Sequence, residues 1–100
     1  MTSTQQTDAF GAALRMLFVQ AGRPTLESAA KAASRSGASL SRQRISDWRN
    51  GRHIPRDYAV VEPLLTWLTV RAIDSGAADV VPLATWREIW AAAQSEPRRR

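Results

Sequence analysis

The residues best suited to binding chemistry are concentrated in one short segment, from Ser41 to Arg52. Ser41 is a preferred N-cap residue and Gly51 readily adopts the left-handed conformation that ends helices, so the two predict a short helix between them. Ile45 and Trp48, three residues apart, define its apolar side. The other side is polar and basic, with side chains that donate and accept hydrogen bonds: Arg42, Gln43, Arg44, Ser46, Asp47 and Asn50.

Charge is distributed unevenly along the chain, whose formal net charge is +5. The segment from Arg15 to Arg56 has nine basic residues against Glu27 and Asp47, whereas residues 57–96 have two against six acids. A one-sided positive field attracts polyanions through counterion release, so nucleic acid is the expected partner class and an anionic membrane a distant second. Thirteen of the fourteen basic residues are arginine. A GC-rich coding sequence would explain that count, but not the clustering.

The composition excludes several other function classes. One hundred residues, 44% of them apolar, predict a single folded domain, and the absence of cysteine excludes disulfides and thiol catalysis. There is no nucleophile with a matching base, no phosphate-binding glycine loop and no metal-spaced histidines, so we expect neither an enzyme nor a cofactor, metal or small-molecule site. No apolar run could span a bilayer, and residues 1–8 do not have the order of a signal peptide. We therefore expect a cytoplasmic protein with no membrane partner.

Helical periodicity predicts two helices before this segment. The first has Asp8 as a plausible N-cap and ends at Gly22, and the second opens at the N-cap residue Thr25 and is rich in alanine. Residues 34–39 have no apolar period and many turn formers, which predicts a loop.

The segment after Arg56 is predicted to be structural. Asp57 is expected to cap a helix, in which Pro63 either introduces a kink or begins a new helix. A last helix has an apolar stripe at helical spacing, made of Leu83, Trp86, Ile89, Trp90 and Ala93. Such a stripe is usually core, and it could also form a dimer contact. The sequence thus predicts a disordered N-terminus (1–7), a single all-α domain (8–94) and a flexible basic tail (95–100).

The string from Ser41 to Gly51 resembles the recognition helix of the phage-repressor and Cro-like helix-turn-helix proteins, the XRE family. That helix begins with Ser or Thr, buries Ile or Val at its fifth position, here Ile45, and closes in Asn-Gly or a similar pair. The resemblance extends roughly over residues 10–61. The loop before the helix is longer than the turn of the simplest members, as in actinobacterial variants of the fold. The resemblance implies a five-helix, λ-repressor-like bundle, acting as a DNA-binding transcriptional regulator at the nucleoid.

The resemblance also implies roles for individual residues. In this family the residues just after the cap, and the residue two positions after the buried isoleucine, contact base edges in the major groove of double-stranded DNA. These positions are Arg42, Gln43 and Asp47. Side chains and amides at the helix ends contact phosphates, which implies phosphate contacts by Ser41, Arg44, Arg49, Asn50 and Arg52. A homodimer is expected, because one short helix contacts few base pairs.

Asp47 is the least obvious of these residues, because phosphates repel a carboxylate. It could accept a hydrogen bond from a cytosine amine, pair with Arg44 three residues earlier, or lie in solvent, and the intrahelical pair is the preferred interpretation. His53 is the only histidine. We expect it to flank a phosphate or lie in solvent.

An alternative function is that of a protein-interaction adaptor, or of the N-terminal module of a larger signalling protein, that kept the fold and lost DNA binding. Such a protein need not keep Arg42, Gln43, Arg44 and Arg52 on the outer side of the segment. A polar helix face by itself usually contacts only water, so it is this clustering that favours DNA.

Overall fold

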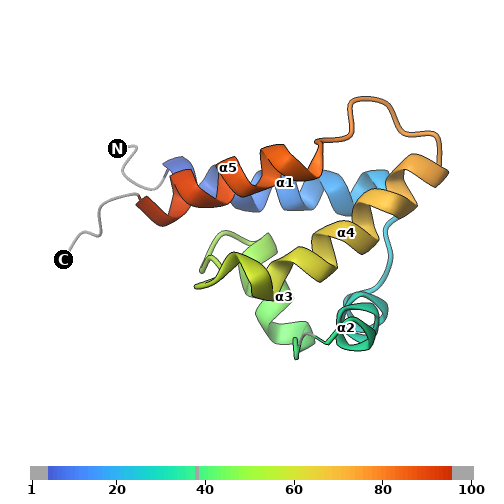
Figure 1. Ribbon diagram of the computed structural model, residues 1–100, viewed down its shortest axis with the longest axis horizontal. Coiled ribbons are helices and arrows are strands. Elements are labelled where there is room, and N and C mark those ends of the chain that lie inside the picture. Colours follow the sequence, from blue (N-terminus) through green and yellow to red (C-terminus); the bar gives the residue numbers. More distant parts are fainter. Residues whose placement is uncertain (1–4, 38, 96–100) are drawn as a thin grey trace.

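The computed structural model describes residues 5–37 and 39–95 of the chain. These residues form five helices and no strand: α1 (Gln5–Gln20), α2 (Leu26–Arg35), α3 (Arg42–Arg49), α4 (Tyr58–Asp74) and α5 (Leu83–Ser95). Helices α1 and α5 pack antiparallel along one side, and α4 contacts α1, α2 and α5 (Figure 1). Helix α3 packs against α1 and α2. The expected all-α, five-helix architecture is confirmed, and none of these helices is long and apolar enough to cross a membrane.

The starts of α2 and α3 follow the predicted capping chemistry. The Thr25 hydroxyl accepts a hydrogen bond from the Ser28 amide at 3.0 Å, and the Ser41 hydroxyl accepts one from the Arg44 amide at 3.1 Å. Each bond satisfies an amide that the first turn of a helix leaves without a partner. Both helices therefore begin where their side chains offer a cap.

Helix α1 begins earlier than expected. It starts at Gln5, inside the segment 1–7 that was expected to be disordered, so Asp8 lies within the helix and not at its N-cap. Glutamine is a good helix former, and two of them precede Thr7. The rest of the predicted N-terminal and C-terminal tails, residues 1–4 and 96–100, lies outside the described residues.

Helix α4 is continuous through Pro63. Proline removes the amide that would bond to the carbonyl of Ala59, and Ala59 is exposed, so water can reach this turn. Asp57 occupies the N-cap position as predicted, but its side chain makes no capping hydrogen bond. No second helix begins at Pro63.

The tryptophan stripe of α5 closes the core. Trp86 is fully buried and packs edge-on against Phe10 of α1, with ring centroids 5.8 Å apart. Leu83, Ile89 and Trp90 are partly buried against the same core. The Trp90 indole also donates a hydrogen bond of 2.8 Å to the Pro55 carbonyl, so α5 holds the segment that follows α3.

Tyr58, the first residue of α4, also contacts α5. Its ring packs against Trp90 at 5.8 Å between centroids, and the Arg87 guanidinium lies 4.8 Å from its centre. Burial raises the pKa of the Tyr58 phenol above its ordinary value of 10.0, the negative charge of Glu62 adds to that shift, and Arg87 opposes it. The phenol thus stays neutral while its ring joins the two helices.

Helix α3 approaches the backbone of α1 at a glycine. A Cβ atom on Gly11 would lie 3.1 Å from the Gly51 nitrogen and 3.2 Å from both the Gly51 Cα and the Trp48 carbonyl oxygen. Gly51 itself has a φ of +78°, which L-residues with side chains rarely adopt. Two glycines therefore allow the end of α3 to lie directly on α1.

The apolar side of α3 is as predicted. Ile45 is fully buried and Trp48 is 3% exposed, and both belong to the main core cluster together with Leu40. Leu40 precedes the cap and Ile45 is the fourth helical residue, the two positions that pack together in a hydrophobic staple. Burial of this side turns the polar side of α3 outward.

Replacing Ile45 by alanine is expected to lower the free energy of unfolding by about 2 to 5 kcal/mol, because it leaves a cavity in the core. The matched control is Ile73→Ala on α4. Ile73 is 61% exposed, so its loss should cost less than about 0.5 kcal/mol. Urea denaturation followed by circular dichroism measures both. Equal losses for the two variants would contradict the placement of Ile45 in the core.

Candidate nucleic-acid interface

The outward side of α3 gathers most of the residues that the sequence singled out. We call Arg42, Gln43, Arg44, Ser46, Asp47 and Asn50 the α3 outer face. Arg42, Gln43, Arg44 and Asn50 are exposed, and Ser46 and Asp47 are half-buried. Ser41 and Arg52, at the two ends of the helix, are exposed as well. Seven of the eight predicted contact residues thus border one continuous surface.

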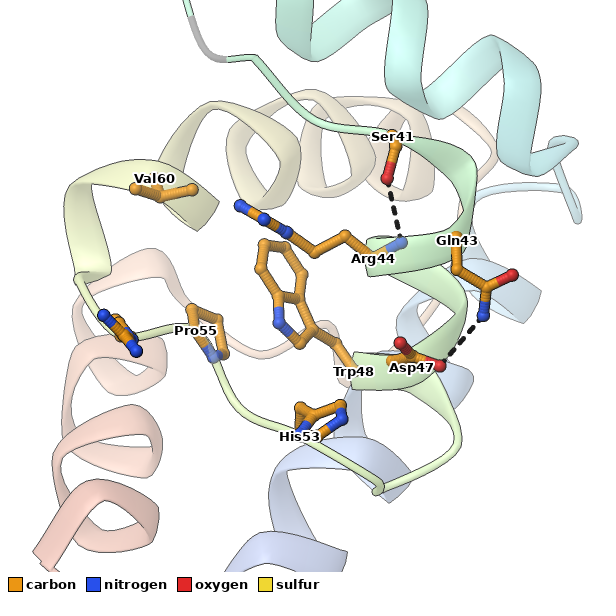
Figure 2. Close-up of a pocket in the computed structure, with 9 residues that line it drawn as sticks. Ser41, Gln43, Arg44, Asp47, Trp48, His53, Pro55 and Val60 are labelled. Carbon is orange, nitrogen blue, oxygen red and sulfur yellow. Dashed lines mark hydrogen bonds between the residues drawn. The ribbon is translucent and has the colours of Figure 1, made fainter.

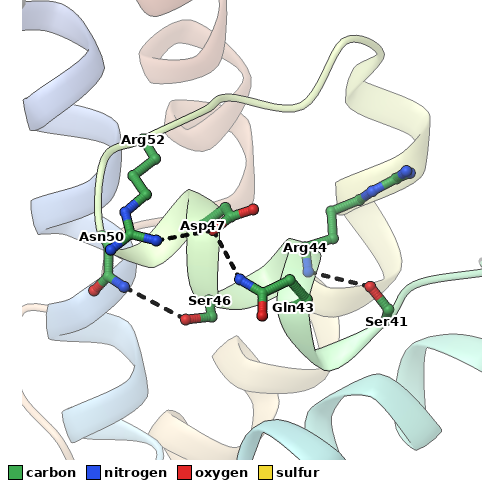
Figure 3. Close-up of polar contacts among 7 residues, drawn as sticks. All are labelled: Ser41, Gln43, Arg44, Ser46, Asp47, Asn50 and Arg52. Atoms are coloured by element: carbon green, nitrogen blue, oxygen red, sulfur yellow. Dashed lines mark hydrogen bonds and ion pairs between the residues drawn. The ribbon is translucent and has the colours of Figure 1, made fainter.

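Separate sets of polar contacts hold side chains on this surface, the largest of them a network of Gln43, Asp47 and Arg52 (Figure 3). The Gln43 side-chain nitrogen donates a hydrogen bond of 3.0 Å to Asp47 Oδ1, and Arg52 Nη1 lies 3.6 Å from the same oxygen. Asn50 Nδ2 donates to the Ser46 hydroxyl at 3.4 Å. The preferred pairing of Asp47 with Arg44 is therefore wrong: Asp47 binds Gln43 one turn earlier and Arg52 beyond the helix end.

The turn at Gly51 explains why Arg52 reaches Asp47. The Gly51 amide bonds to the Trp48 carbonyl at 3.2 Å and the Arg52 amide bonds to the Asp47 carbonyl at 2.9 Å, the two bonds of a Schellman motif. The motif folds the chain back along the last turn of α3. Because the Arg52 amide is hydrogen-bonded to the Asp47 carbonyl, the Arg52 side chain begins close to the Asp47 carboxylate.

Arg44 instead lies in a groove between α3 and the start of α4, which we call the α3–α4 groove. Figure 2 shows its side chain extending alongside the Trp48 ring toward Val60. The groove is also lined by His53 and Arg56, both exposed. Arg56 was not among the predicted contact residues. Its position in the basic segment after Gly51 is the sequence feature that could have identified it.

A second groove borders the opposite edge of α3. It is lined by Thr25 and Glu27 at the start of α2 and by Arg42, Gln43 and Ser46 of α3, and we call it the α2–α3 groove. Glu27 makes this groove less positive than the α3–α4 groove, which has Arg44 and Arg56 against Asp47 alone. The α3 outer face is thus a ridge between two grooves of different charge.

Arg49 does not join the outer face. Its guanidinium lies 5.0 Å from the centre of the buried Phe18 ring, a cation–π contact with α1. Arg15 Nη1 donates a 2.6 Å hydrogen bond to the Arg49 carbonyl, one of the carbonyls that a helix end leaves without a partner. Arg15, Arg49 and Arg23 line one pocket near the end of α3. Arg15 and Arg23 lie far from α3 in sequence, so spacing along the chain did not reveal them.

Replacing Asp47 by alanine is expected to release Gln43 and Arg52 with little loss of stability, less than about 1 kcal/mol, because the contacts are near the surface. The side-chain amide resonances of Gln43 should move in an NMR spectrum of Asp47→Ala and stay in place in Arg44→Ala. Unmoved Gln43 resonances in Asp47→Ala would contradict the network, and a shift of the Arg44 Nε resonance larger than that of Arg52 Nε in the same variant would restore the Asp47–Arg44 pair.

Within the part of the chain that the structure describes, no group of three or more His, Asp or Glu side chains could hold a metal ion. No protein-family model, curated protein or solved structure matches the chain. The chemistry of this surface therefore has to be inferred from its own residues: a polar helix face fixed by its buried side, with arginine in both bordering grooves.

Proposed function

We propose that the chain is a helix-turn-helix protein that binds double-stranded DNA, with the α3 outer face in the major groove. The observation that carries this proposal is the combination of a deeply anchored helix with an uninterrupted polar outer side. Ile45 and Trp48 are buried in the core, while Arg42, Gln43 and Arg44 are all exposed. The resemblance of this segment to phage-repressor recognition helices supports the same function.

The dimensions and chemistry of α3 suit a major groove. An α-helix with its side chains is about 10 to 12 Å in diameter, which matches the width of the major groove, and the eight residues of α3 extend about 12 Å along it. Arg42 offers a guanidinium that can donate twice to guanine, and Gln43 offers an amide that can donate to and accept from adenine. Both follow the Ser41 cap, and in helix-turn-helix proteins the N-terminal residues of this helix contact the bases.

The two grooves beside α3 are the proposed positions of the DNA backbones. On one side Arg44, His53 and Arg56 line the α3–α4 groove, where positive and polar side chains would contact phosphates. On the other side Arg42 and the positive N-terminal end of α2 would attract the second strand against the charge of Glu27. Each strand of the duplex would thus meet a different element of the fold.

Asp47 has a positioning role in this proposal. Its carboxylate holds the Gln43 amide nitrogen at 3.0 Å and lies 3.6 Å from Arg52 Nη1, so it orients both side chains before DNA arrives. A held side chain loses less rotamer freedom on binding. The pairing with Arg52 also offsets the repulsion between Asp47 and a phosphate. Both contacts use Oδ1, so Oδ2 could still accept a hydrogen bond from a cytosine amine.

We further propose that the protein acts as a homodimer at the nucleoid, as a transcriptional regulator. One α3 contacts few base pairs, and a second copy multiplies discrimination. Large apolar side chains on α1 and α4 are exposed and could contribute to a protein contact: Met16, Val19, Val70 and Ile73. The same side chains favour the second candidate function, a protein-interaction adaptor, which would retain this surface and show no affinity for DNA.

Arg42→Ala and Gln43→Ala are each expected to cost about 1 to 3 kcal/mol of binding free energy on a selected duplex and to relax preference at one base position. The duplex comes from selection on a randomised library, and gel-shift titration measures affinity. Arg87→Ala on α5 is the control, because it removes the same charge away from α3. Unchanged affinity and preference in both α3 variants would rule out the proposed base contacts, and no binding by the parent chain would favour the adaptor.

Arg52→Ala should weaken binding to all duplexes alike and lower the slope of log affinity against log salt by about one. The substitution also leaves Asp47 without its cation. On random duplexes the double variant Arg52→Ala/Asp47→Ala separates the lost phosphate contact from the added repulsion, whereas on a selected duplex Asp47→Ala also releases Gln43. Titrations at two salt concentrations with selected and random duplexes measure both. A loss confined to the selected duplex would assign Arg52 to base recognition instead.

A further inference from the structure

A third groove, more basic than the two beside α3, lies between α2 and α4. Four cationic side chains line it, Arg23, Lys31, Arg35 and Arg71, together with Ser28 and Trp67. No carboxylate among the described residues belongs to this lining. The groove brings together residues from two helices and the link between α1 and α2, so it exists only in the folded chain. We call it the α2–α4 groove.

Arg71 is held in place by two contacts. Its Nε donates to the Ala21 carbonyl at 3.3 Å, and its guanidinium lies 5.0 Å from the centre of the Trp67 ring. Stacking on an aromatic ring and a hydrogen bond from Nε are typical of a guanidinium fixed for recognition. A ligand that contacts Arg71 would therefore lose little side-chain entropy in doing so.

The other three cations share the groove with no carboxylate among the described residues of its lining. Glu27, one turn before Lys31 on α2, lines the α2–α3 groove instead. Lys31 and Arg35 are one turn apart on α2 and both are exposed, a spacing at which like charges repel and destabilise a helix. Arg23 has a left-handed backbone with φ of +56°. Its amide donates a hydrogen bond of 2.8 Å to the Phe18 carbonyl, which stabilises this conformation. A bound anion would relieve the repulsion among these groups.

We propose that the α2–α4 groove is a second anion site, which binds a run of phosphate groups. Phosphates fit better than the carboxylates of an acidic peptide because of charge density. A terminal phosphate group carries about −1.5 to −2 charges on three acceptor oxygens, whereas a carboxylate carries one charge on two oxygens. Three arginines also offer bidentate contacts to phosphate oxygens.

Two sources share this chemistry: a free polyphosphate, and the backbone of DNA beyond the segment bound at α3. Thr25 borders both the α2–α3 and the α2–α4 grooves, which lie on either side of α2. A duplex bound at α3 would therefore have to bend across α2 to reach the second site. The DNA source rests on the proposed function, whereas the free polyphosphate source does not.

The test compares two double variants of the full chain that lose the same charge, Lys31→Ala/Arg35→Ala and Arg42→Ala/Arg44→Ala. Isothermal titration with inorganic tripolyphosphate should show a loss of about tenfold or more in the first variant and less than about twofold in the second. For the DNA source, a duplex extended beyond the α3 site should lose about two units of salt slope in the first variant, while a short duplex should not. Either result supports the second site.

Three results would overturn it. Equal losses of tripolyphosphate affinity in both variants would indicate a general positive field. If Lys31→Ala/Arg35→Ala binds tripolyphosphate and both duplexes as tightly as the parent chain does, the groove binds no phosphate. Binding of poly-glutamate as tight as that of tripolyphosphate, with the same dependence on Lys31 and Arg35, would assign the groove to an acidic protein. If α3 does not bind DNA, the variant Arg42→Ala/Arg44→Ala will have the duplex affinity of the parent chain. This result tests the proposed function and is independent of the three results above.

Discussion

The orientation of α3 depends on the contact between the backbones of Gly11 and Gly51. Any side chain at Gly11 would meet backbone atoms within about 3.2 Å, and backbone cannot move aside as a flexible side chain does. One turn further along α1, Arg15 binds the carbonyl of Arg49. These contacts fix the C-terminal end of α3, and the Schellman turn that follows directs Arg52 onto Asp47. The polar network is therefore a consequence of how closely two helices approach.

Much of the fold could be predicted from local patterns. Hydroxyl caps at Thr25 and Ser41, and the spacing of Ile45 and Trp48, depend on a few neighbouring residues, and all are found as expected. The start of α1 could not be predicted in this way, because Asp8 satisfies the rule for a cap and the helix forms without using it. A good N-cap residue marks a position where a helix can begin, but good helix formers before that residue can extend the helix past it.

The candidate site was predicted less completely, because its contacts join residues distant along the chain. Helical spacing identified the α3 outer face, but it offered Arg44 as the partner of Asp47, when the turn at Gly51 supplies Arg52 instead. Arg49 has the charge expected of a phosphate contact, but its guanidinium stacks on the Phe18 ring of α1. The α2–α4 groove joins residues 23–35 to residues 67–71, so only the packing of α2 on α4 reveals it.

The hydrogen bond from the Trp90 indole to the Pro55 carbonyl gives the protein a built-in optical probe. Pro55 lies in the segment that lines the α3–α4 groove, and the bond of 2.8 Å joins that segment to α5. Indole fluorescence depends on hydrogen bonding and on local polarity, so the emission of Trp90 would respond when this segment moves. Trp86, fully buried against Phe10, would keep a constant blue-shifted signal as long as the core is intact. Trp90 and Trp86 thus report on two different parts of the protein from the same helix, the segment after α3 and the core, beside the emission of Trp48 and Trp67.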